Sequence, residues 1–451
     1  ETLAIISSNV KGGEHLGSSI VGRNVSLNSA EGLAIYGSDI IASGTASVQS
    51  AGKLPTSSES GEDDQEDVAM VISGLSDFYE RGAAGASNHA FALLSRPAFI
   101  SGARGVFINT SGENESPSMI MNDSVLDSAL GIVMLNSQGN MRLEAGQEEL
   151  YSLSSKTYTK KSWFGAKRKK ITETRIKQRV EASPVVARGQ NIYLRSGGSI
   201  DAYATDFLAP NGEIKITAAN ALSLYSVPEI SFNSFEVKTR TSYLGTIHSS
   251  KTKTTTTRQV ADQLPATLVA QSASTNSGWD TLLQGTVFQT SLSGANISVG
   301  VGDSANIYAK IILEGVKRTV TESRTKEANY VVWQRQMGSG STVETLTLPK
   351  FIGPTPPVFN GPVLAQIPEG VFKTQIQALS QQAGLGYLQD LAARNDVNWQ
   401  PVRLAFEQWE YEQEGLTPAG AALLAVGVAW ATGGMGAELL GTTTELTSAM
   451  A

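Results

Sequence analysis

Short apolar patterns recur along this chain: an Asn or a similar polar residue precedes two apolar residues at i and i+2. That spacing places the apolar pair on one face of a β-strand and the intervening side chain on the other. We therefore expect strands with one buried and one solvated face. The five clearest segments are Asn24-Val25-Ser26-Leu27, Asn140-Met141-Arg142-Leu143, Asn191-Ile192-Tyr193-Leu194, Glu213-Ile214-Lys215-Ile216 and Asn296-Ile297-Ser298-Val299.

The segments repeat at a nearly constant step. Asn191 and Glu213 lie 22 residues apart, and Gly17-Ser18-Ser19-Ile20 is echoed 20 residues later by Gly37-Ser38-Asp39-Ile40. A period of about 20 residues is typical of a β-solenoid, whose stacked coils bury a continuous core. A large β-sandwich with coincidental strand similarity is the alternative. We predict a mainly β fold: a right-handed parallel β-helix (β-solenoid) with protruding β-hairpin arms and a small C-terminal α-helical domain.

Two Lys- and Thr-rich stretches, at 156–175 and 237–258, interrupt the coils. Ser162-Trp163-Phe164-Gly165 in the first matches Ser242-Tyr243-Leu244-Gly245 in the second, at an offset of 80. Thr/Lys alternation on both sides of a glycine turn predicts two exposed antiparallel strands. Each stretch is therefore expected to project from the solenoid as a hairpin arm. A third, weaker arm is expected around Gly338-Ser339-Gly340-Ser341.

The C-terminal part changes character. Prolines within 351–369 are expected to end the β pattern, because proline cannot donate to a sheet ladder. Apolar residues at helical spacing follow, including Val402, Phe406 and Trp409. Residues 418–431 open with proline in the first helical position. A helix of that length spans about 21 Å, short of the ~30 Å of a membrane core, so a buried helix is favoured over a membrane-associating hairpin.

These features divide the chain into eight expected segments. Length alone predicts two to four domains, but a solenoid grows in one dimension and makes that estimate unreliable. The expected segments are 1–154 (solenoid coils), 155–183 (first arm), 184–228 (coils), 229–262 (second arm), 263–315 (coils), 316–350 (third arm), 351–369 (Pro-rich linker) and 370–451 (helical pre-toxin-like domain).

Composition narrows the function classes. The formal net charge of -7 argues against a general nucleic-acid binder, which needs a basic surface. The absence of cysteine excludes disulfides and thiolate metal sites, and it suits a chain threaded unfolded across an outer membrane. No basic-then-apolar signal peptide opens the chain at Glu1, so we expect a mature product or an excised internal piece.

The sequence contains no catalytic constellation. Its three histidines share no metal-ligand spacing, and the acidic run at 57–67 lacks the ligand pattern of a calcium loop, which favours a solvated loop. Parallel β-helices also host pectin-cleaving enzymes, but Asp201 and Asp206 are the only acids near a regular coil. We therefore expect no enzyme, no metal and no cofactor.

The first arm carries the sharpest local feature, a set of cations around aromatic residues. This combination suits an anionic surface such as lipopolysaccharide or phospholipid headgroups. The alternative is a solvated hairpin whose lysines prevent edge-to-edge aggregation. The second arm keeps an aromatic and an apolar residue but loses most of the charge after its glycine. The candidate envelope-contact residues are Lys160, Lys161, Trp163, Phe164, Lys167, Arg168, Tyr243 and Leu244.

The coils, the Lys-Lys-Ser-Trp-Phe-Gly arm at 160–165 and the Glu-Gly-Leu-Thr-Pro-Ala tail at 414–419 resemble a known family. They are similar to the haemagglutinin-repeat and pre-toxin region of filamentous haemagglutinins and contact-dependent growth inhibition effectors. The resemblance covers most of residues 120–440, and the tail is its most specific part. It implies secretion by a two-partner system to the cell surface of a Gram-negative bacterium. In the toxic branch it also implies delivery of a C-terminal toxin into neighbouring cells.

The resemblance also implies partners. These are an outer-membrane secretion partner for the full-length protein and the target-cell outer membrane or its receptor, while self-assembly stays open. The family's N-terminal secretion domain and Val-Glu-Asn-Asn toxin border do not occur before Ala451, so a downstream toxin domain is inferred from the family alone. The expected function is a non-catalytic stalk and translocation region that contacts a target envelope. The alternative is an adhesin filament segment that binds host-cell glycans or surfaces.

Overall fold

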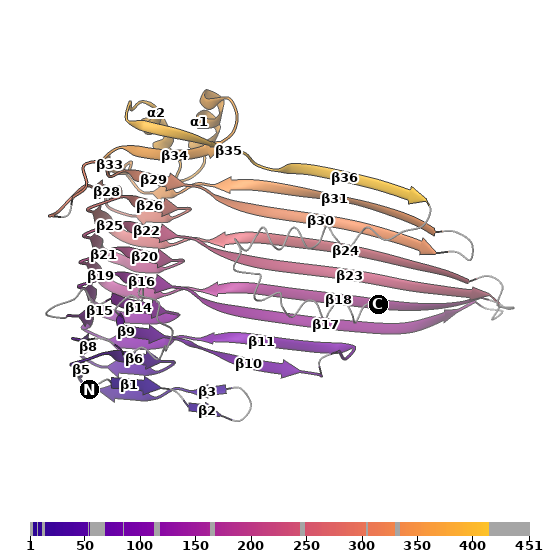
Figure 1. Ribbon diagram of the computed structural model, residues 1–451, viewed down its shortest axis with the longest axis horizontal. Helices are drawn as coiled ribbons and strands as arrows, with labels where there is room; N and C mark the ends of the chain where they lie inside the picture. Colours follow the sequence, from indigo (N-terminus) through magenta and orange to yellow (C-terminus); the bar gives the residue numbers. More distant parts are fainter. Residues whose placement is uncertain are drawn as a thin grey trace, which may run out of the picture.

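The protein is mainly β, with two parallel sheets that form a rod and an antiparallel sheet that projects from one side of it (Figure 1). The computed structural model describes residues 3–6, 8–10, 14–52, 54, 68–83, 85–111, 118–162, 167–243, 249–303, 305–329 and 334–414. Stacked parallel strands of this kind are compatible with the expected β-helix.

The first parallel sheet has 11 strands, and neighbouring strands in it are separated in the sequence by excursions to the other sheets. Its strands, in order across the sheet, are β1 (Leu3–Ile6), β6 (Leu33–Tyr36), β9 (Val68–Ser73), β14 (Ser118–Asn122), β16 (Met141–Glu144), β20 (Ile200–Tyr203), β22 (Leu222–Tyr225), β26 (Thr281–Gln284), β29 (Ile311–Glu314), β34 (Val363–Pro368) and β35 (Val397–Val402).

The second parallel sheet has 14 strands and faces the first across the core. One passage of the chain through both sheets is called a coil below. The strands are β4 (Ser19–Gly22), β5 (Val25–Ser29), β7 (Asp39–Ala42), β8 (Thr45–Ser50), β12 (Ala98–Gly102), β13 (Gly105–Thr110), β15 (Ser124–Ser137), β19 (Val186–Ser196), β21 (Asp206–Ala218), β25 (Thr267–Ser277), β27 (Val287–Thr290), β28 (Asn296–Val299), β32 (Lys350–Ile352) and β33 (Val358–Asn360).

The sequence repeats correspond to the registers of these parallel strands. Ile200 of β20 pairs with Leu222 of β22, which is the step of 22. Near the N-terminus, Ile20 of β4 pairs with Ile40 of β7, which is the step of 20. Each repeat therefore places a residue beside its counterpart one coil later, and equivalent apolar side chains stack.

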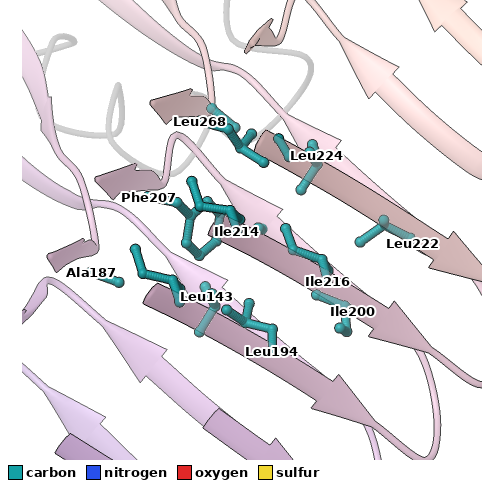
Figure 2. Packing of buried hydrophobic residues seen from close by; sticks show 14 of the residues in the cluster. Leu143, Ala187, Leu194, Ile200, Phe207, Ile214, Ile216, Leu222, Leu224 and Leu268 are labelled. Carbon is teal, nitrogen blue, oxygen red and sulfur yellow. The ribbon is translucent and has the colours of Figure 1, made fainter. Parts of the chain in front are cut away.

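The core of the rod lies between the two parallel sheets. Ile200 and Leu222 reach it from the first sheet, and Leu194, Phe207 and Ile216 reach it from the second, all at 2% exposure or less. Figure 2 shows these side chains packed against one another. Full burial of a side chain of this size contributes about 1.5–3 kcal/mol relative to exposure, so the dry interior is the main source of the rod's stability.

The Asn that opens the repeated pattern links one coil to the next. The Oδ1 atom of Asn191 accepts a hydrogen bond from the backbone N–H of Glu213 at 2.9 Å, and Asn24 accepts one from Thr45 at 3.0 Å. A backbone donor at a coil corner needs such a partner. The Asn thus pairs with a backbone donor at the coil corner, while the apolar residues after it pack in the core.

Nine long strands form the antiparallel sheet, called the arm sheet below. A separate two-stranded hairpin joins β2 (Ser8–Val10) to β3 (Glu14–Leu16). The arm sheet runs, in order, through β10 (Leu75–Arg81), β11 (Asn88–Arg96), β17 (Gly146–Lys161), β18 (Lys167–Ser183), β23 (Val227–Tyr243), β24 (Ser249–Leu264), β30 (Val316–Asn329), β31 (Gln334–Thr347) and β36 (Phe406–Glu414).

The hairpins of the arm sheet leave the rod at every second coil. Strands β9, β16, β22 and β29 are each followed by a hairpin, whereas β14, β20 and β26 continue directly into the second parallel sheet. Two coils stacked at about 4.8 Å each match two hairpin strands at the same spacing. Each hairpin therefore meets the next at hydrogen-bonding distance, and the arms merge into one sheet (Figure 1).

Antiparallel hairpins occupy all three stretches where arms were expected, at 146–183, 227–264 and 316–347. A further hairpin, β10–β11, lies within 1–154, where the sequence predicts coils alone. Its residues include Leu75, Phe78 and Leu93 and show no Lys/Thr alternation, so the pattern that marked the other arms is missing.

Two short helices lie beside the last coil: α1 (Phe372–Ser380) and α2 (Tyr387–Ala392) (Figure 1). The Tyr387 ring meets Phe351 edge-on, with centroids 5.0 Å apart, and its hydroxyl donates to the Pro349 carbonyl at 3.0 Å. Burial raises the pKa of Tyr387. These helices join the core of the rod and cover its last strands.

Two predictions for the C-terminal part are wrong. Residues 351–369 contain β33, β34 and the end of β32, because the prolines lie between these strands or, like Pro368, at a strand end. Phe406 and Trp409 lie in β36 rather than in a helix, since the open edge of β31 pairs with this segment and overrides its helical spacing. The helical domain expected at 370–451 is supported only by α1 and α2, and residues 415–451 lie outside the described residues.

Asp123 links hairpins β10–β11 and β17–β18 where they leave the rod. Its carboxylate accepts hydrogen bonds from the hydroxyls of Ser95, at 2.5 Å, and Ser183, at 2.7 Å, near the ends of β11 and β18. It has a positive φ of 46°, and a Cβ added at Gly74 would lie 2.2 Å from its Oδ2 atom. Burial raises the pKa of Asp123, and the two hydroxyls oppose that rise.

Candidate functional site

The two arms predicted from the Ser-Trp-Phe-Gly and Ser-Tyr-Leu-Gly matches lie side by side. Strand β18 of the first hairpin pairs with β23 of the second, and Lys167 is directly opposite Tyr243. Strand β17 contains 16 residues, so its far end lies about 50 Å from the rod at 3.3–3.4 Å per residue. The arm sheet thus brings both candidate segments to one end, far from the core.

Exposed cations gather at this end and form what we call the tip cluster. Directly opposed residues in it carry like charges: Lys161 faces Arg168, and Lys170 faces Arg240. Like charges opposite one another on antiparallel strands are destabilising. The members of the tip cluster are Lys160, Lys161, Lys167, Arg168, Lys169, Lys170, Arg240 and Lys251.

Among the described residues, no acid lies on the parts of β17, β18, β23 and β24 that carry the tip cluster. The sequence has no acidic residue between Thr159 and Thr172 or between Val237 and Ala261. The nearest acids along β18 and β23 are Glu173 and Glu236, and both already have partners there. The tip therefore concentrates positive charge on a chain whose formal net charge is -7.

The acids that border the tip cluster hold local partners. The Glu173 carboxylate accepts a hydrogen bond from the Tyr158 hydroxyl at 2.8 Å, which raises the pKa of Tyr158. The Glu236 carboxylate forms ion pairs with Lys238 at 2.8 Å and Lys253 at 3.3 Å. These contacts use the acidic groups of β18 and β23, and Glu327 of β30 lies opposite Lys253, so the described acids border the tip cluster rather than lie within it.

Two tyrosine rings support cations of the cluster. The Lys167 ammonium lies 5.4 Å from the centroid of Tyr243, and the Lys160 ammonium lies 5.7 Å from that of Tyr158. Both separations fall within the ~6 Å range of a cation–π contact. Tyr243 is 47% exposed, so its ring is also open to a partner.

The arm sheet is a single layer, and successive side chains of each strand point to its two opposite faces. We call them the threonine face and the basic face. Hydroxyl pairs mark the threonine face, such as Thr157 with Thr172 at 2.9 Å and Thr257 with Ser323 at 2.5 Å. The basic face carries alternate residues of β18. The cations among them are Lys167, Lys169, Arg175, Lys177 and Arg179, and Ile171, Glu173 and Glu181 lie on the same face.

The tip cluster occupies both faces. Lys161, Arg168 and Lys170 extend the threonine face, while Lys160 and Lys169 extend the basic face. A planar anionic layer that receives the end of the sheet edge-on would meet cations on both sides. A layer that lies flat against either face alone would meet only part of the cluster.

The described site contains five of the eight predicted contact residues. Trp163, Phe164 and Leu244 lie outside the described residues. Arg240 and Lys251 are tip residues that the sequence prediction missed, whereas Lys169 and Lys170 belong to the basic run that the sequence shows in the first arm. The two from the second arm were missed because their importance depends on β23 and β24 pairing beside β18. The five residues brought together are Lys160, Lys161, Lys167, Arg168 and Tyr243.

Within the described residues, no set of three His, Asp or Glu side chains is arranged to hold a metal ion. His89 contacts Glu80 at 2.9 Å in the β10–β11 hairpin. Asp201 and Asp206 belong to different parallel sheets, and burial raises the pKa of Asp206.

No helix within the described part of the chain is long and apolar enough to span a membrane.

Comparisons with protein-family models, with curated proteins and with solved structures find no match to this chain.

Proposed function

We propose that this chain is a right-handed β-solenoid stalk that presents a cationic arm sheet to the anionic surface of a target cell. In this proposal the stalk is secreted, is not catalytic, and helps deliver a C-terminal toxin across the target envelope. The observation that carries the proposal is the tip cluster, with eight exposed cations on two segments, 160–171 and 238–260, that contain no acid.

Charge complementarity supports an anionic membrane surface as the partner of the tip. A Lys or Arg near such a surface contributes about 1 kcal/mol of binding, and the contribution falls off within a Debye length of about 8–10 Å. Eight cations therefore suffice for measurable binding even if each contributes only part of that value. An anionic partner also relieves the repulsion between opposed residues such as Lys161 and Arg168.

The distance between tip and rod supports a stalk. An arm of about 50 Å extends well beyond a Debye length, so the acidic remainder of the chain does not repel the anionic surface that the tip contacts. Export through an outer-membrane secretion partner, toxin delivery and a Gram-negative source rest on the resemblance of 160–165 and 414–419 to two-partner secretion effectors. Nucleic acid is not part of the proposal.

An adhesin that binds host glycans is the second candidate, favoured by a ring pair at the β36 edge. Trp409 and Tyr411 lie 5.9 Å apart with planes 16° from parallel. They cover Gly340 and Gly338, where an added Cβ would lie 2.4 and 2.6 Å from ring atoms. Both rings belong to the threonine face, where Ser323 lies opposite Gly340. A flat aromatic pair beside hydroxyls is suited to an uncharged sugar.

Two matched variants separate these functions. The tip variant replaces Lys161, Arg168, Lys170 and Lys251 with Gln, and the rod control replaces the exposed cations Arg104, Arg188, Arg195 and Lys215 with Gln. Both change the net charge equally. We expect the tip variant, but not the rod control, to lose binding of the labelled chain to Gram-negative cells. Unchanged bacterial binding by the tip variant contradicts the proposal. Loss of epithelial-cell binding in Trp409→Ala alone supports the adhesin instead.

A further inference from the structure

A shallow groove crosses the basic face of the arm sheet near its root, about 30 Å from the tip along β17. Its volume is about 550 Å³, and its floor spans β11 and β17 between walls on β10 and β18. The groove lies in the part of the sheet built by the β10–β11 hairpin, which the arm pattern of the sequence did not reveal. It belongs neither to the tip cluster nor to the ring pair on the threonine face.

Small side chains create the groove. One row across this face pairs Tyr79 with Ala92 and Ala92 with Leu150. The next row on the same face, two residues further along the strands, pairs Ala90 with Ser152. Ala90, Ala92 and Ser152 are much shorter than the tyrosine, lysine and arginine side chains around them, so they leave a depression. The result is a floor of methyl groups and one hydroxyl, with larger side chains on both sides.

The groove is apolar and open to solvent. Leu150 is 39% exposed and Tyr79 is 40% exposed. The hydrocarbon stems of Lys177 and Arg179 add to its wall on β18, since such side chains place methylenes along apolar surface and keep their charge in water. Exposed apolar area bordered by polar groups is typical of a binding site.

Two cations flank this floor from opposite sides. Arg81 extends the wall on β10, and Lys177 extends the wall on β18 in the same row as Ala90 and Ser152. Arg179 is paired with Glu181, whereas Arg81 and Lys177 form no ion pair among the described residues. A ligand with an acidic group above this row would be attracted by both cations.

The backbone of the floor excludes an extended peptide as the preferred ligand. Strands β11 and β17 are paired on both sides, so their N–H and C=O groups are already used within the sheet. A peptide laid on this face finds no backbone partners, although strand addition depends on them. A hydrocarbon chain needs none.

We propose that this groove binds a single-chain anionic lipid. The acyl chain lies over Ala90, Ala92 and Leu150, and the acidic head group lies between Arg81 and Lys177. A volume of about 550 Å³ falls in the 300–1,000 Å³ range of small-molecule sites. The proposal goes beyond envelope contact by the tip, because it assigns a second ligand to a different part of the sheet.

The test uses cis-parinaric acid, a fluorescent fatty acid, with the full chain. We expect saturable binding at one site. Ala92→Phe fills the floor and should weaken binding at least about tenfold, since burial of the acyl chain is lost. The matched control Ser339→Phe adds the same ring to the basic face outside the groove and should bind as the wild type does. Equal binding by both variants overturns the proposal.

The head group is tested separately. Arg81→Gln with Lys177→Gln should weaken binding of the acid about tenfold, while the neutral methyl ester should bind this variant and the wild type alike. The control pair Arg324→Gln with Lys326→Gln removes two cations from the same face outside the groove. The assignment fails if the ester binds wild type as tightly as the acid does. It also fails if an acidic, leucine-rich peptide saturates the groove where the fatty acid does not.

Discussion

The rod and the arm sheet consist of the same kind of strand but are stabilised differently. In the rod, Phe207 and Phe288 are at most 1% exposed and lie in a continuous apolar interior. In the arm sheet, Phe78 is 44% exposed and Tyr79 is 40% exposed, because no second sheet among the described residues covers this single layer. Burial of apolar side chains stabilises the rod, whereas pairing between neighbouring strands of one layer stabilises the arm sheet.

This difference shows how a rod of stacked parallel strands can extend a large surface away from its core. Hairpins at every second coil reach one another at the strand spacing that the coils impose, so each hairpin satisfies the edge of the next. Within the described part of the chain, no second layer covers either face. The coil spacing of the rod therefore sets the hairpin spacing of the arm sheet, although the side chains on the arm sheet all belong to the hairpins.

The largest effect that distinguishes the regions is expected from a pair of Phe substitutions. Phe207→Ala in the rod should lower the free energy of unfolding by about 3–5 kcal/mol, because it leaves a cavity in a packed interior. Phe235→Ala in the arm sheet removes a ring that lies 5.0 Å from the Arg175 guanidinium and should cost less than about 1.5 kcal/mol. Denaturant titrations followed by circular dichroism measure both, and equal losses would contradict the comparison.

A smaller loss is expected at the junction of the two regions. Asp123→Ala should destabilise the chain by about 1–3 kcal/mol, because the hydroxyls of Ser95 and Ser183 lose their acceptor. Asp123→Asn, which keeps an acceptor and tolerates a positive φ, serves as the milder control. Urea unfolding should order the three proteins as wild type, Asn, Ala. An Ala variant as stable as the wild type would show that Asp123 does not stabilise the junction.

The same site predicts a pH dependence. Since burial raises the folded-state pKa of Asp123 above its ordinary 3.8, the folded chain binds this proton more tightly than the unfolded chain does. The contribution of this group to stability should therefore fall as pH rises through the folded pKa. Relative to Asp123→Asn, the wild type should gain stability between pH 7 and pH 4, measured by urea unfolding at each pH. No relative change would show that the carboxylate is not strained by burial.

The smallest effect is expected at the tip. Lys169→Glu replaces one member of an opposed like-charge pair with Lys160 and should stabilise the arm sheet by about 0.2–1 kcal/mol. Lys169→Gln should give a smaller gain. Hydrogen exchange of the β17 and β18 amides at low salt detects this change. Slower exchange is the expected result, and faster exchange would mean that the lysines stabilise the hairpin.

The sequence predicted the rod better than the arm sheet. The step of 22 identified the partners Ile200 and Leu222, because one buried face constrains both periodicity and register. The positions of Arg240 and Lys251 beside Lys170 depend on coil spacing, which no local pattern encodes. The β10–β11 hairpin, and with it the groove, was missed because its strands have no Lys/Thr alternation. Strand β36 was missed because pairing with β31 determines its conformation.

Vesicle flotation tests most directly whether the tip of the arm sheet binds anionic membranes. Wild type and the rod control should float with vesicles that contain anionic phospholipid, should not float with neutral vesicles, and should be released as salt is raised. The tip variant, which lacks the charges of Lys161, Arg168, Lys170 and Lys251, should stay at the bottom of the gradient with both vesicles. Flotation of the tip variant equal to that of the rod control would contradict the claim.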